Sequence, residues 1–425
     1  MPWRDDLVPR RMARVAVVAP ETRWRRVLAE VAAAGVVEPE ADRGSGGNTG
    51  ALDDELDRVT GASAGRPPLR AVAGWAPLAA VAPLTERLAP LGGAVVVLPA
   101  PPGAEPPTLL AQPEQSSGRA LVDTYATVPY RDVDPTWFAV GAYVVMFGMM
   151  FGDAGDALLL VAGGLWLWRT RSPKLAGVRR VWPLMVAMGV AAGLFGVLYG
   201  ELFGPTGVIE PVWLEPLDQP NRLLAAGVVV GATLLAVAFG IGVVNRWREG
   251  GPGLALYSPS GAAGAALFVA FALVAGGVVW DVTWMWAAGA ALGLVALVLA
   301  GVGLKTEAGP GAAGGLQTGV ELFDVVIRLG SNLVSFARLA AFGLTHAALG
   351  MVIWDAVTVL WASGPGKLAA VAVFAVGHAV AFGLEALVAG VQALRLEYYE
   401  LFSRIFASTG RPFRPWHVPL EPEDP

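Results

Sequence analysis

Long apolar runs occupy the chain from Trp137 almost to its end, and this feature limits the possible folds more than any other. A transmembrane helix needs about 20 predominantly apolar residues to cross a hydrocarbon core about 30 Å thick. Of the 425 residues, 55% are hydrophobic and only 15% are charged, whereas soluble proteins have about 25% charged residues. We therefore predict a mainly α-helical, polytopic membrane protein that is preceded by a small α/β domain.

About eight transmembrane helices are predicted, and the last two are long enough to be strongly tilted or to protrude. The predicted spans lie near residues 136–151, 154–168, 182–203, 223–245, 262–280, 284–303, 319–362 and 367–408. With eight spans, basic loops such as "RTRSPKLAGVRR" and "NRWREGG" all fall on one side. By the positive-inside rule that side is the cytoplasm. This orientation predicts a multi-pass protein of the cell membrane with cytoplasmic N- and C-termini.

Residues 1–134 are predicted to form a cytoplasmic α/β domain of two small lobes, 1–39 and 67–100. In each lobe a β-branched run, such as "RVAVVAP", precedes a helical pattern; the first helix ends at Gly35. A Gly-rich, acidic connection joins the lobes, and a Pro-rich exit linker leads to the membrane domain, 135–425. The segment "GSGGNTG" lacks the Lys of a nucleotide-binding P-loop, so we interpret it as linker.

Composition also excludes several functional classes. The chain has no Cys, which removes disulfides, thiolate metal sites and Cys nucleophiles. The three His are scattered along the sequence and do not suggest a zinc site. A net charge of −5 without basic blocks argues against nucleic-acid binding. We expect no cofactor and no catalytic site of the chain's own.

The segment 319–362 carries an unusual number of polar residues. On a continuous helix one face would present Asp324, Ser331, Ser335, Arg338 and Thr345, with Arg328 and His346 at its edges. A central Arg costs at least about 2.5–3.5 kcal/mol on insertion scales. Arg338 therefore has to face a partner or water; a structural ion pair within the helix bundle is the alternative.

The segment 367–408 repeats this pattern. His378, Glu385, Gln392 and Tyr399 recur every seven residues, and Arg395 lies beside their stripe. If the two segments are antiparallel, His346 and Glu385 lie toward the outer side and Asp324, Arg328 and Ser331 toward the cytoplasm. Arg338, and with it Gln392, would lie between them. Two polar clusters separated by a cation predict two offset access channels rather than one continuous pore. A structural role is favoured for His378, and a solvated carboxylate for Glu201.

Three motifs resemble those of a known family. "FGMMFGDAG", "SNLVSFARLAAFGLTHAAL" and "LEALVAGVQALRLEYYELFSRIF" are similar to signatures of subunit a, also called subunit I, of V-type and archaeal-type rotary ATPases. "GVLYGELFG" and the "PTW" that opens the first span add to the resemblance. It covers the whole membrane region and, more loosely, both soluble lobes.

The resemblance implies a stator that couples proton or sodium translocation to ATP hydrolysis or synthesis. In this family the last two helices face a rotating proteolipid ring whose subunits each carry a carboxylate. Arg338 matches the arginine that meets this carboxylate, and Arg395 matches the second arginine. Asp324 and Ser331 match positions of the cytoplasmic half-channel, which Ser335 adjoins, while Glu385 and His346 match positions of the outer half-channel. Gln392 stands where many relatives have His.

The implied partners are the proteolipid ring, the peripheral stalk subunits, the central-stalk-associated subunit under the ring, the lipid bilayer and, indirectly, the catalytic head. The family inserts a long coiled-coil hairpin between the two lobes, whereas the connection here is about 25 residues long and shows no sustained heptads. Two other interpretations remain: a secondary transporter that uses the same polar helices, and a structural anchor that has lost coupling.

Overall fold

A computed structural model describes residues 8–40, 52–101, 103–110 and 116–417. The chain divides into two compact units, and each is described by itself. The first comprises Met1–Gln112, Ala126–Asp134 and Ser408–Pro425; the second comprises Pro113–Tyr125 and Pro135–Ala407. The segment 116–125 thus packs with the helical unit, although the sequence places it in the α/β domain. Residues 408–417 pack with the sheet-bearing unit.

The first unit is built on one antiparallel sheet in which β1 (Met12–Pro20) is central. It pairs with β4 (Leu69–Pro77) on one side and with β5 (Ala94–Leu98) on the other. The short strands β2 (Glu38–Pro39) and β3 (Ala64–Arg66) both pair with β4. The predicted division into two lobes is therefore not what the structure shows, because the strands of both segments bond to each other and share one sheet.

Helices α1 (Trp24–Ala34) and α3 (Leu78–Leu88) contribute to this core, together with Leu56 and Val59 of the helix at 52–61 and Trp416 of the tail. The core buries alternate side chains of β1, including Val15 and Val17, against Val27 and Leu28 of α1. The stretch predicted as a linker holds α2 (Leu52–Gly61) and β3, whereas "GSGGNTG" lies outside the described residues. The predicted strands and helices of both segments are otherwise present within a few residues of their expected bounds.

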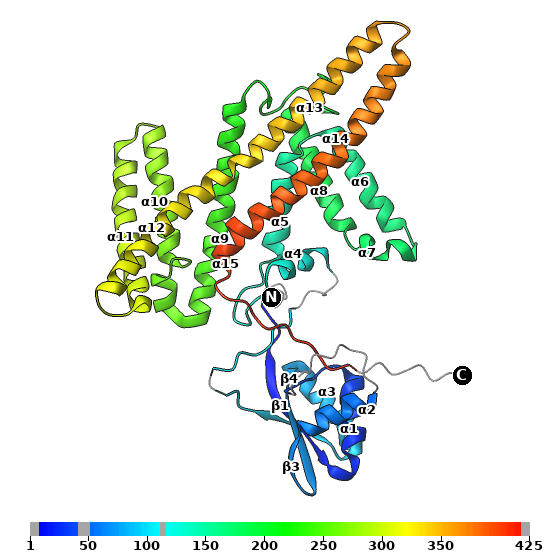
Figure 1. Ribbon diagram of the computed structural model, residues 1–425, viewed down its shortest axis with the longest axis vertical. Coiled ribbons are helices and arrows are strands. Elements are labelled where there is room, and N and C mark those ends of the chain that lie inside the picture. Colours follow the sequence, from blue (N-terminus) through cyan, green and yellow to red (C-terminus); the bar gives the residue numbers. More distant parts are fainter. Residues whose placement is uncertain (1–7, 41–51, 102, 111–115, 418–425) are drawn as a thin grey trace. The chain divides into compact units, whose positions relative to one another are not determined.

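The second unit is a helical assembly (Figure 1). Its helices in chain order are α4 (Ser117–Tyr125), α5 (Thr136–Met150), α6 (Ala154–Arg169), α7 (Ala176–Arg179), α8 (Trp182–Tyr199), α9 (Pro220–Tyr257), α10 (Ala262–Val279), α11 (Thr283–Ala308), α12 (Ala312–Ser335), α13 (Ala337–Ala362), α14 (Lys367–Leu396) and α15 (Ser403–Ile405). A π-helical turn, Glu397–Phe402, joins α14 to α15. Helices α13 and α14, yellow and orange in Figure 1, run side by side.

Among the described residues six helices are long and apolar enough to cross a membrane: Trp182–Tyr199, Pro220–Tyr257, Ala262–Val279, Thr283–Ala308, Ala312–Ala362 and Lys367–Ile405. This finding agrees with a multi-pass membrane protein, but the predicted number of eight is not confirmed. Helices α5 and α6 occupy the first two predicted spans and have only 15 and 16 residues. At 1.5 Å per residue they reach about 22–24 Å, which is shorter than the hydrocarbon core.

The predicted span 319–362 lies within the long helix Ala312–Ala362, which one turn residue, Phe336, with right-handed helical angles (φ −73°, ψ −14°), divides into α12 and α13. The Ser335 hydroxyl donates to the Ser331 carbonyl oxygen at 3.0 Å, a local bond that bends helices. The Phe336 ring packs on Gly231 of α9, where an added Cβ would lie 2.1 Å from Phe336 Cγ. Phe336, a large aromatic residue, therefore packs against α9 at a position where α9 has no side chain.

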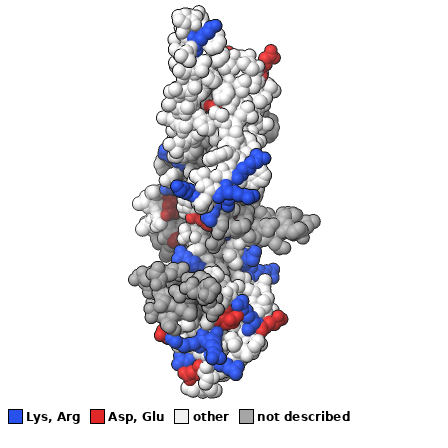
Figure 2. Space-filling model, turned by 90° about the vertical axis from the view of Figure 1, so that its right-hand side faces the viewer, with Lys and Arg blue, Asp and Glu red and all other residues white. Residues whose placement is uncertain are grey.

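The surface of the helical unit is mostly apolar. In the view of Figure 2 few charged side chains interrupt its uncharged surface. Large apolar side chains on α14 are widely exposed, among them Leu368 at 82% and Leu387 at 67%. Of the hydrophobic window within Lys367–Ile405, only 6% is buried inside the chain. Such a surface requires lipid or an apolar partner to cover it.

Candidate functional site

A buried polar cluster lies where the loop before α6, the loop after α8, α13 and α14 meet. Its centre is Asp153, which is 0% exposed and is the N-cap of α6. Asp153 Oδ1 accepts hydrogen bonds from the backbone N–H groups of Gly155 at 2.7 Å and Asp156 at 3.0 Å. This capping satisfies two helix N–H groups that would otherwise have no partner.

The loop after α8 wraps around the same carboxylate. Phe203 N donates to Asp153 Oδ1 at 2.9 Å, and Gly204 N donates to Oδ2 at 2.6 Å. Both loop residues are in the left-handed region, with φ of 52° and 85°, so their successive N–H groups converge on one anion. A bulky residue at positive φ is strained. One carboxylate therefore ties together two loops that are separated by about 50 residues in the sequence.

His346 of α13 brings the cluster to the long helices. Its Nδ1 pairs with Glu385 Oε2 of α14, while its Nε2 lies 4.0 Å from Asp153 Oδ2. The His346 ring also packs on Phe151, with centroids 5.1 Å apart. The two residues predicted at the outer side of the long helices, His346 and Glu385, are thus in direct contact.

Two further carboxyl groups complete the cluster. Glu201 and Asp156 are each 2% exposed, so the expectation of a solvated Glu201 was wrong. Glu201 Oε1 and Asp156 Oδ1 are buried and have no hydrogen-bond partner among the described residues. One oxygen each of Asp153 and Glu201 and one nitrogen of His346 lie within 4.8 Å of one another. The cluster therefore holds more carboxyl groups than cations, which creates a demand for protons or another cation.

His378 lies on the fourth turn of α14, beside this cluster. It is 7% exposed and packs against Phe374 and Phe203, with centroids 4.6 and 5.3 Å away. Its Nε2 finds no hydrogen-bond partner in the described part of the chain. Ring contacts therefore hold His378 in place, and a hydrogen bond for it stays a prediction.

Two cavities reach the cluster, and they share no lining residue. The first, of about 100 Å³, contains Glu201 and Glu215 and is otherwise lined by the loop after α8. The second, of about 260 Å³, opens between α13 and α14 and contains His346 and Glu385. Apolar side chains form the rest of the second cavity: Met150, Phe342, Leu349, Leu384, Val388 and Ala389, together with Thr345. The polar cluster therefore connects a loop cavity with a cavity on the α13–α14 face.

The two predicted arginines lie at the other end of the long helices. Arg338 precedes His346 by eight residues on α13, which is about 12 Å along the helix axis. It is half-buried, and its Nη1 is buried without a hydrogen-bond partner among the residues that the structure describes. Arg395 is exposed near the end of α14, and its charge acts on that of Arg338. The long helices therefore hold two guanidinium groups whose charges act on each other, and one of them has a nitrogen without a hydrogen-bond partner among the described residues.

Acidic groups near the arginines were missed by sequence reasoning. Glu400, in the π-helical turn, is 9% exposed, lies within hydrogen-bonding reach of Ser335, and interacts electrostatically with Arg338 and Arg395. Glu397 is 0% exposed, and neither of its carboxyl oxygens has a hydrogen-bond partner in the described ranges. Their place in "LEYYELF" gave only a weak signal, because a π-helical turn rotates residues away from the positions that a 3.6-residue period predicts.

The remaining predicted residues lie on α12 and α14. Asp324 Oδ2 accepts from Arg328 Nε at 2.7 Å, and both side chains are at least half-exposed. Ser331 is exposed one turn further along α12. Gln392 is half-buried on α14, and its Oε1 is buried without a described partner. Asp324 and Ser331 lie on α12 and Arg338 on α13, on either side of the turn at Phe336.

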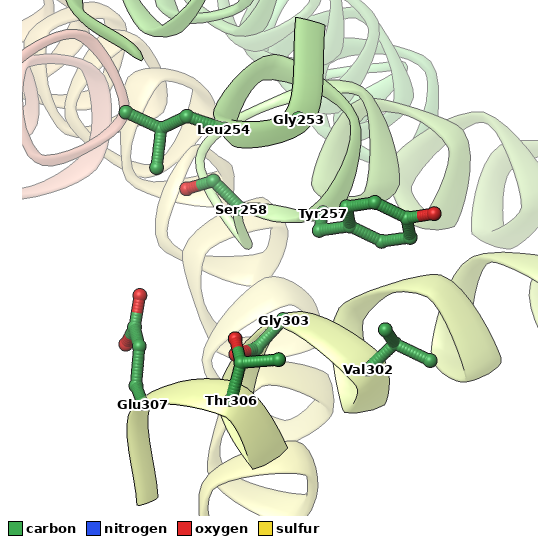
Figure 3. A pocket seen from close by; sticks show the side chains of 8 residues that line it. All are labelled: Gly253, Leu254, Tyr257, Ser258, Val302, Gly303, Thr306 and Glu307. Carbon is green, nitrogen blue, oxygen red and sulfur yellow. The ribbon is translucent and has the colours of Figure 1, made fainter.

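Figure 3 shows a third cavity, which lies between the end of α9 and α11. Its volume is about 310 Å³, and Glu307 is the one carboxyl group among the labelled side chains. None of the labelled residues belongs to the predicted site or to the polar cluster. This cavity is therefore separate from the features described above.

Comparisons with known proteins show what the chain is similar to. A sequence model of the V-type ATPase 116kDa subunit family matches residues 93–211. This range includes the loops around Asp153 and Glu201.

Several A-type ATP synthase subunits I from archaea are similar to the chain. The subunit of Pyrococcus horikoshii is 27% identical over 334 residues, which cover 74% of this chain and 48% of the relative. That of Methanocaldococcus jannaschii is 24% identical over 76% of this chain and 51% of its own length. That of Archaeoglobus fulgidus is 29% identical over 81% of this chain and 58% of its own length. The predicted resemblance to subunit I is therefore confirmed, and the chain spans about half the length of the curated relatives it matches.

Proposed function

We propose that the chain is a membrane stator subunit of a rotary A/V-type ATPase and couples proton or sodium movement to ATP synthesis or hydrolysis. Its membrane domain, 135–425, would provide two ion half-channels, and 1–134 would form the cytoplasmic domain, with both termini in the cytoplasm. The observation that carries the proposal is the buried Nη1 of Arg338, which has no hydrogen-bond partner among the described residues. Glu400 acts electrostatically on this guanidinium, and the unmet hydrogen-bonding demand is one that a carboxylate of another chain could satisfy.

A carboxylate of a proteolipid ring is the proposed partner of Arg338. The exposed apolar surface of α14 would pack against the ring, and Arg338 would favour the ionised form of each passing carboxylate. At about 4 Å and an effective dielectric constant near 20, the attraction is about 4 kcal/mol. This attraction is large enough to bias ionisation, while competing solvation and the next carboxylate can offset it. Arg395 would extend the positive field along α14.

The polar cluster supports an outer half-channel. Glu201 faces the cavity of the loop after α8, and His346 with Glu385 faces the cavity between α13 and α14. Protons could pass along these carboxyl and imidazole groups between the two cavities. Arg338, about 12 Å further along α13, would end this path and repel a free proton.

The cytoplasmic half-channel is proposed on the exposed stripe of α12. Asp324 and Ser331 would line it, with Ser335 at its inner end next to Arg338, and Gln392 would face it from α14. The peripheral stalks, the central-stalk subunit under the ring and, through them, the catalytic head are the further proposed partners. No catalytic site within this chain is required for this role.

Two experiments test the proposal. First, the chain is purified in mild detergent through a C-terminal tag, and co-purifying chains are identified by mass spectrometry. A small proteolipid together with nucleotide-binding subunits is expected; a chain that purifies alone from membranes with a complete rotary ATPase would favour a transporter or an uncoupled anchor.

Second, ATP-driven proton uptake is measured in membrane vesicles that contain the assembled complex. Arg338→Gln is expected to abolish uptake, because a neutral amide cannot favour the ionised ring carboxylate. Arg222→Gln serves as the matched control, since Arg222 is exposed and bonds only the side chain of Gln219 among the contacts in the structure. Uptake by Arg338→Gln above about half of the wild-type rate would refute the assignment.

A further inference from the structure

The buried cluster has the composition of a transition-metal site. It combines one imidazole nitrogen of α13 with carboxylate oxygens from two loops, and Asp153, Glu201 and His346 are all at least nine-tenths buried. Sequence spacing gave no such indication, since the three His are far apart and only one of them enters the cluster. The loops on Asp153 and Glu201 bring the oxygens to His346.

The orientation of His346 is that of a metal ligand. Nδ1 is engaged by Glu385, so the lone pair of a neutral ring lies on Nε2, which faces Asp153 Oδ2 at 4.0 Å. That distance is too long for a hydrogen bond. Two ligands of one tetrahedral ion, each about 2.0–2.2 Å from it, lie about 3.3–3.6 Å apart, so an ion would draw these two atoms together by about half an ångström. A carboxylate behind the distal nitrogen is also the usual second partner of a metal-binding His.

The second, independent observation is a buried oxygen of Glu201 that lacks a partner in the part of the chain that the structure describes. The Glu201 side chain is 2% exposed, and its Oε1 has no hydrogen-bond partner among the described residues. One of its carboxylate oxygens lies within 4.8 Å of ligand atoms of Asp153 and His346. A buried carboxyl oxygen in this state is costly unless a proton or a metal ion compensates it. The cavity that contains Glu201 gives an ion a route from the loop.

We propose that Asp153 Oδ2, Glu201 and His346 Nε2 form a binding site for a divalent transition-metal ion, with zinc as the ion that fits best. Zinc accepts mixed imidazole and carboxylate ligands in a four-coordinate site and keeps a position for water. Magnesium and calcium fit less well, since they prefer oxygen ligands throughout. Glu385 acts as a positioning residue that orients the His346 ring. Occupation of the site would block the path between the two cavities, a consequence that rests on the proposed function.

The test measures zinc binding to the purified full chain by isothermal titration calorimetry in a detergent without chelating groups. The chain offers a low background because it has no Cys and three His; the tag must contain no His. We expect one zinc ion per chain and X-ray absorption that reports only nitrogen and oxygen neighbours at about 2.0–2.1 Å.

Variants assign the ligands. His346→Gln and Glu201→Gln are each expected to weaken zinc binding at least tenfold. Glu385→Gln is expected to weaken it about 10–100-fold, because Glu385 bonds the ring nitrogen of His346 that does not face the metal. Glu385→Asp keeps a carboxylate and should recover part of the affinity. His417→Ala is the control, because His417 is exposed in the other unit. Near-wild-type thermal unfolding of the apo variants shows that they fold.

Absence of stoichiometric zinc binding, or binding that persists in folded His346→Gln and Glu201→Gln, would overturn the site. Neither result bears on the stator role, which Arg338→Gln tests separately. Inhibition of proton uptake by zinc in the assembled wild-type complex, half-complete at the zinc concentration that half-saturates the purified chain, supports the blocked path. Stoichiometric binding without inhibition would overturn the position of this site on the ion path and count against the proposed outer half-channel.

Discussion

Replacing Asp153 by Ala is the most informative perturbation of the helical unit, since this carboxylate accepts four backbone N–H groups while being 0% exposed. Loss of an N-cap costs about 0.5–2 kcal/mol. The N–H groups of Phe203 and Gly204 would also lose their acceptor, at about 1–3 kcal/mol each. The expected loss of unfolding free energy is therefore about 2.5–8 kcal/mol, summed from these contributions.

Asp153→Asn removes the negative charge but keeps one acceptor oxygen, so it tests the two contributions separately. An amide oxygen in the Oδ1 position can still accept from Gly155, Asp156 and Phe203, whereas its NH₂ group would face the Gly204 N–H without accepting from it. Only one bond is then lost, so we expect about 1–3 kcal/mol. Asp218→Ala is the control, because Asp218 is exposed in the loop before α9 and such changes stay within about 0.5 kcal/mol.

The assay is SDS-induced unfolding in mixed micelles, followed by far-UV circular dichroism and by the fluorescence of the 15 Trp. Thiol-reactive dyes are unsuitable because the chain has no Cys. A loss below about 1 kcal/mol for Asp153→Ala, less than one unsatisfied buried N–H, would refute the argument that these four N–H groups depend on one carboxylate. Equal losses for Ala and Asn would show that charge matters rather than the number of acceptors.

Two further predictions concern backbone packing and pH. An added Cβ on Gly204 (φ 85°) would lie 2.8 Å from Gly350 C, whereas Gly207 (φ 71°) has open space. In the same SDS assay Gly204→Ala should therefore cost about 2–5 kcal/mol through strain and overpacking, and Gly207→Ala only about 1–2 through strain; equal costs would contradict the close approach. In the first unit the hydrogen bond from Arg14 lowers the pKa of Glu40. The lowered pKa adds stability that is complete above the unfolded-state pKa of about 4.3 and is lost as the pH falls through the folded pKa. Amide exchange in β1 should accordingly be slower in wild type than in Arg14→Gln near neutral pH, and the difference should vanish in acid; a difference that is independent of pH would contradict this.

The sequence by itself determined the elements whose signals are local. Apolar runs and a 3.6-residue period are properties of consecutive residues, so α8, α10 and α11 lie within about five residues of their predicted bounds, whereas α9 continues to Tyr257 and two helices fill the predicted span 319–362. The β-branched runs likewise predicted β1, β4 and β5. The motifs around Arg338, Arg395 and Asp153 carried enough specific residues to indicate the family.

Only the tertiary structure decided which polar groups are buried together. Asp153 and Glu201 look like solvated loop residues in the sequence, yet both are enclosed, because Phe203 and Gly204 bond across about 50 residues to Asp153. The packing of Phe336 likewise depends on a glycine of another helix, and the single sheet depends on β1 pairing with strands more than 50 residues away. Burial and pairing arise from contacts between distant segments, and neither composition nor periodicity within one segment records them.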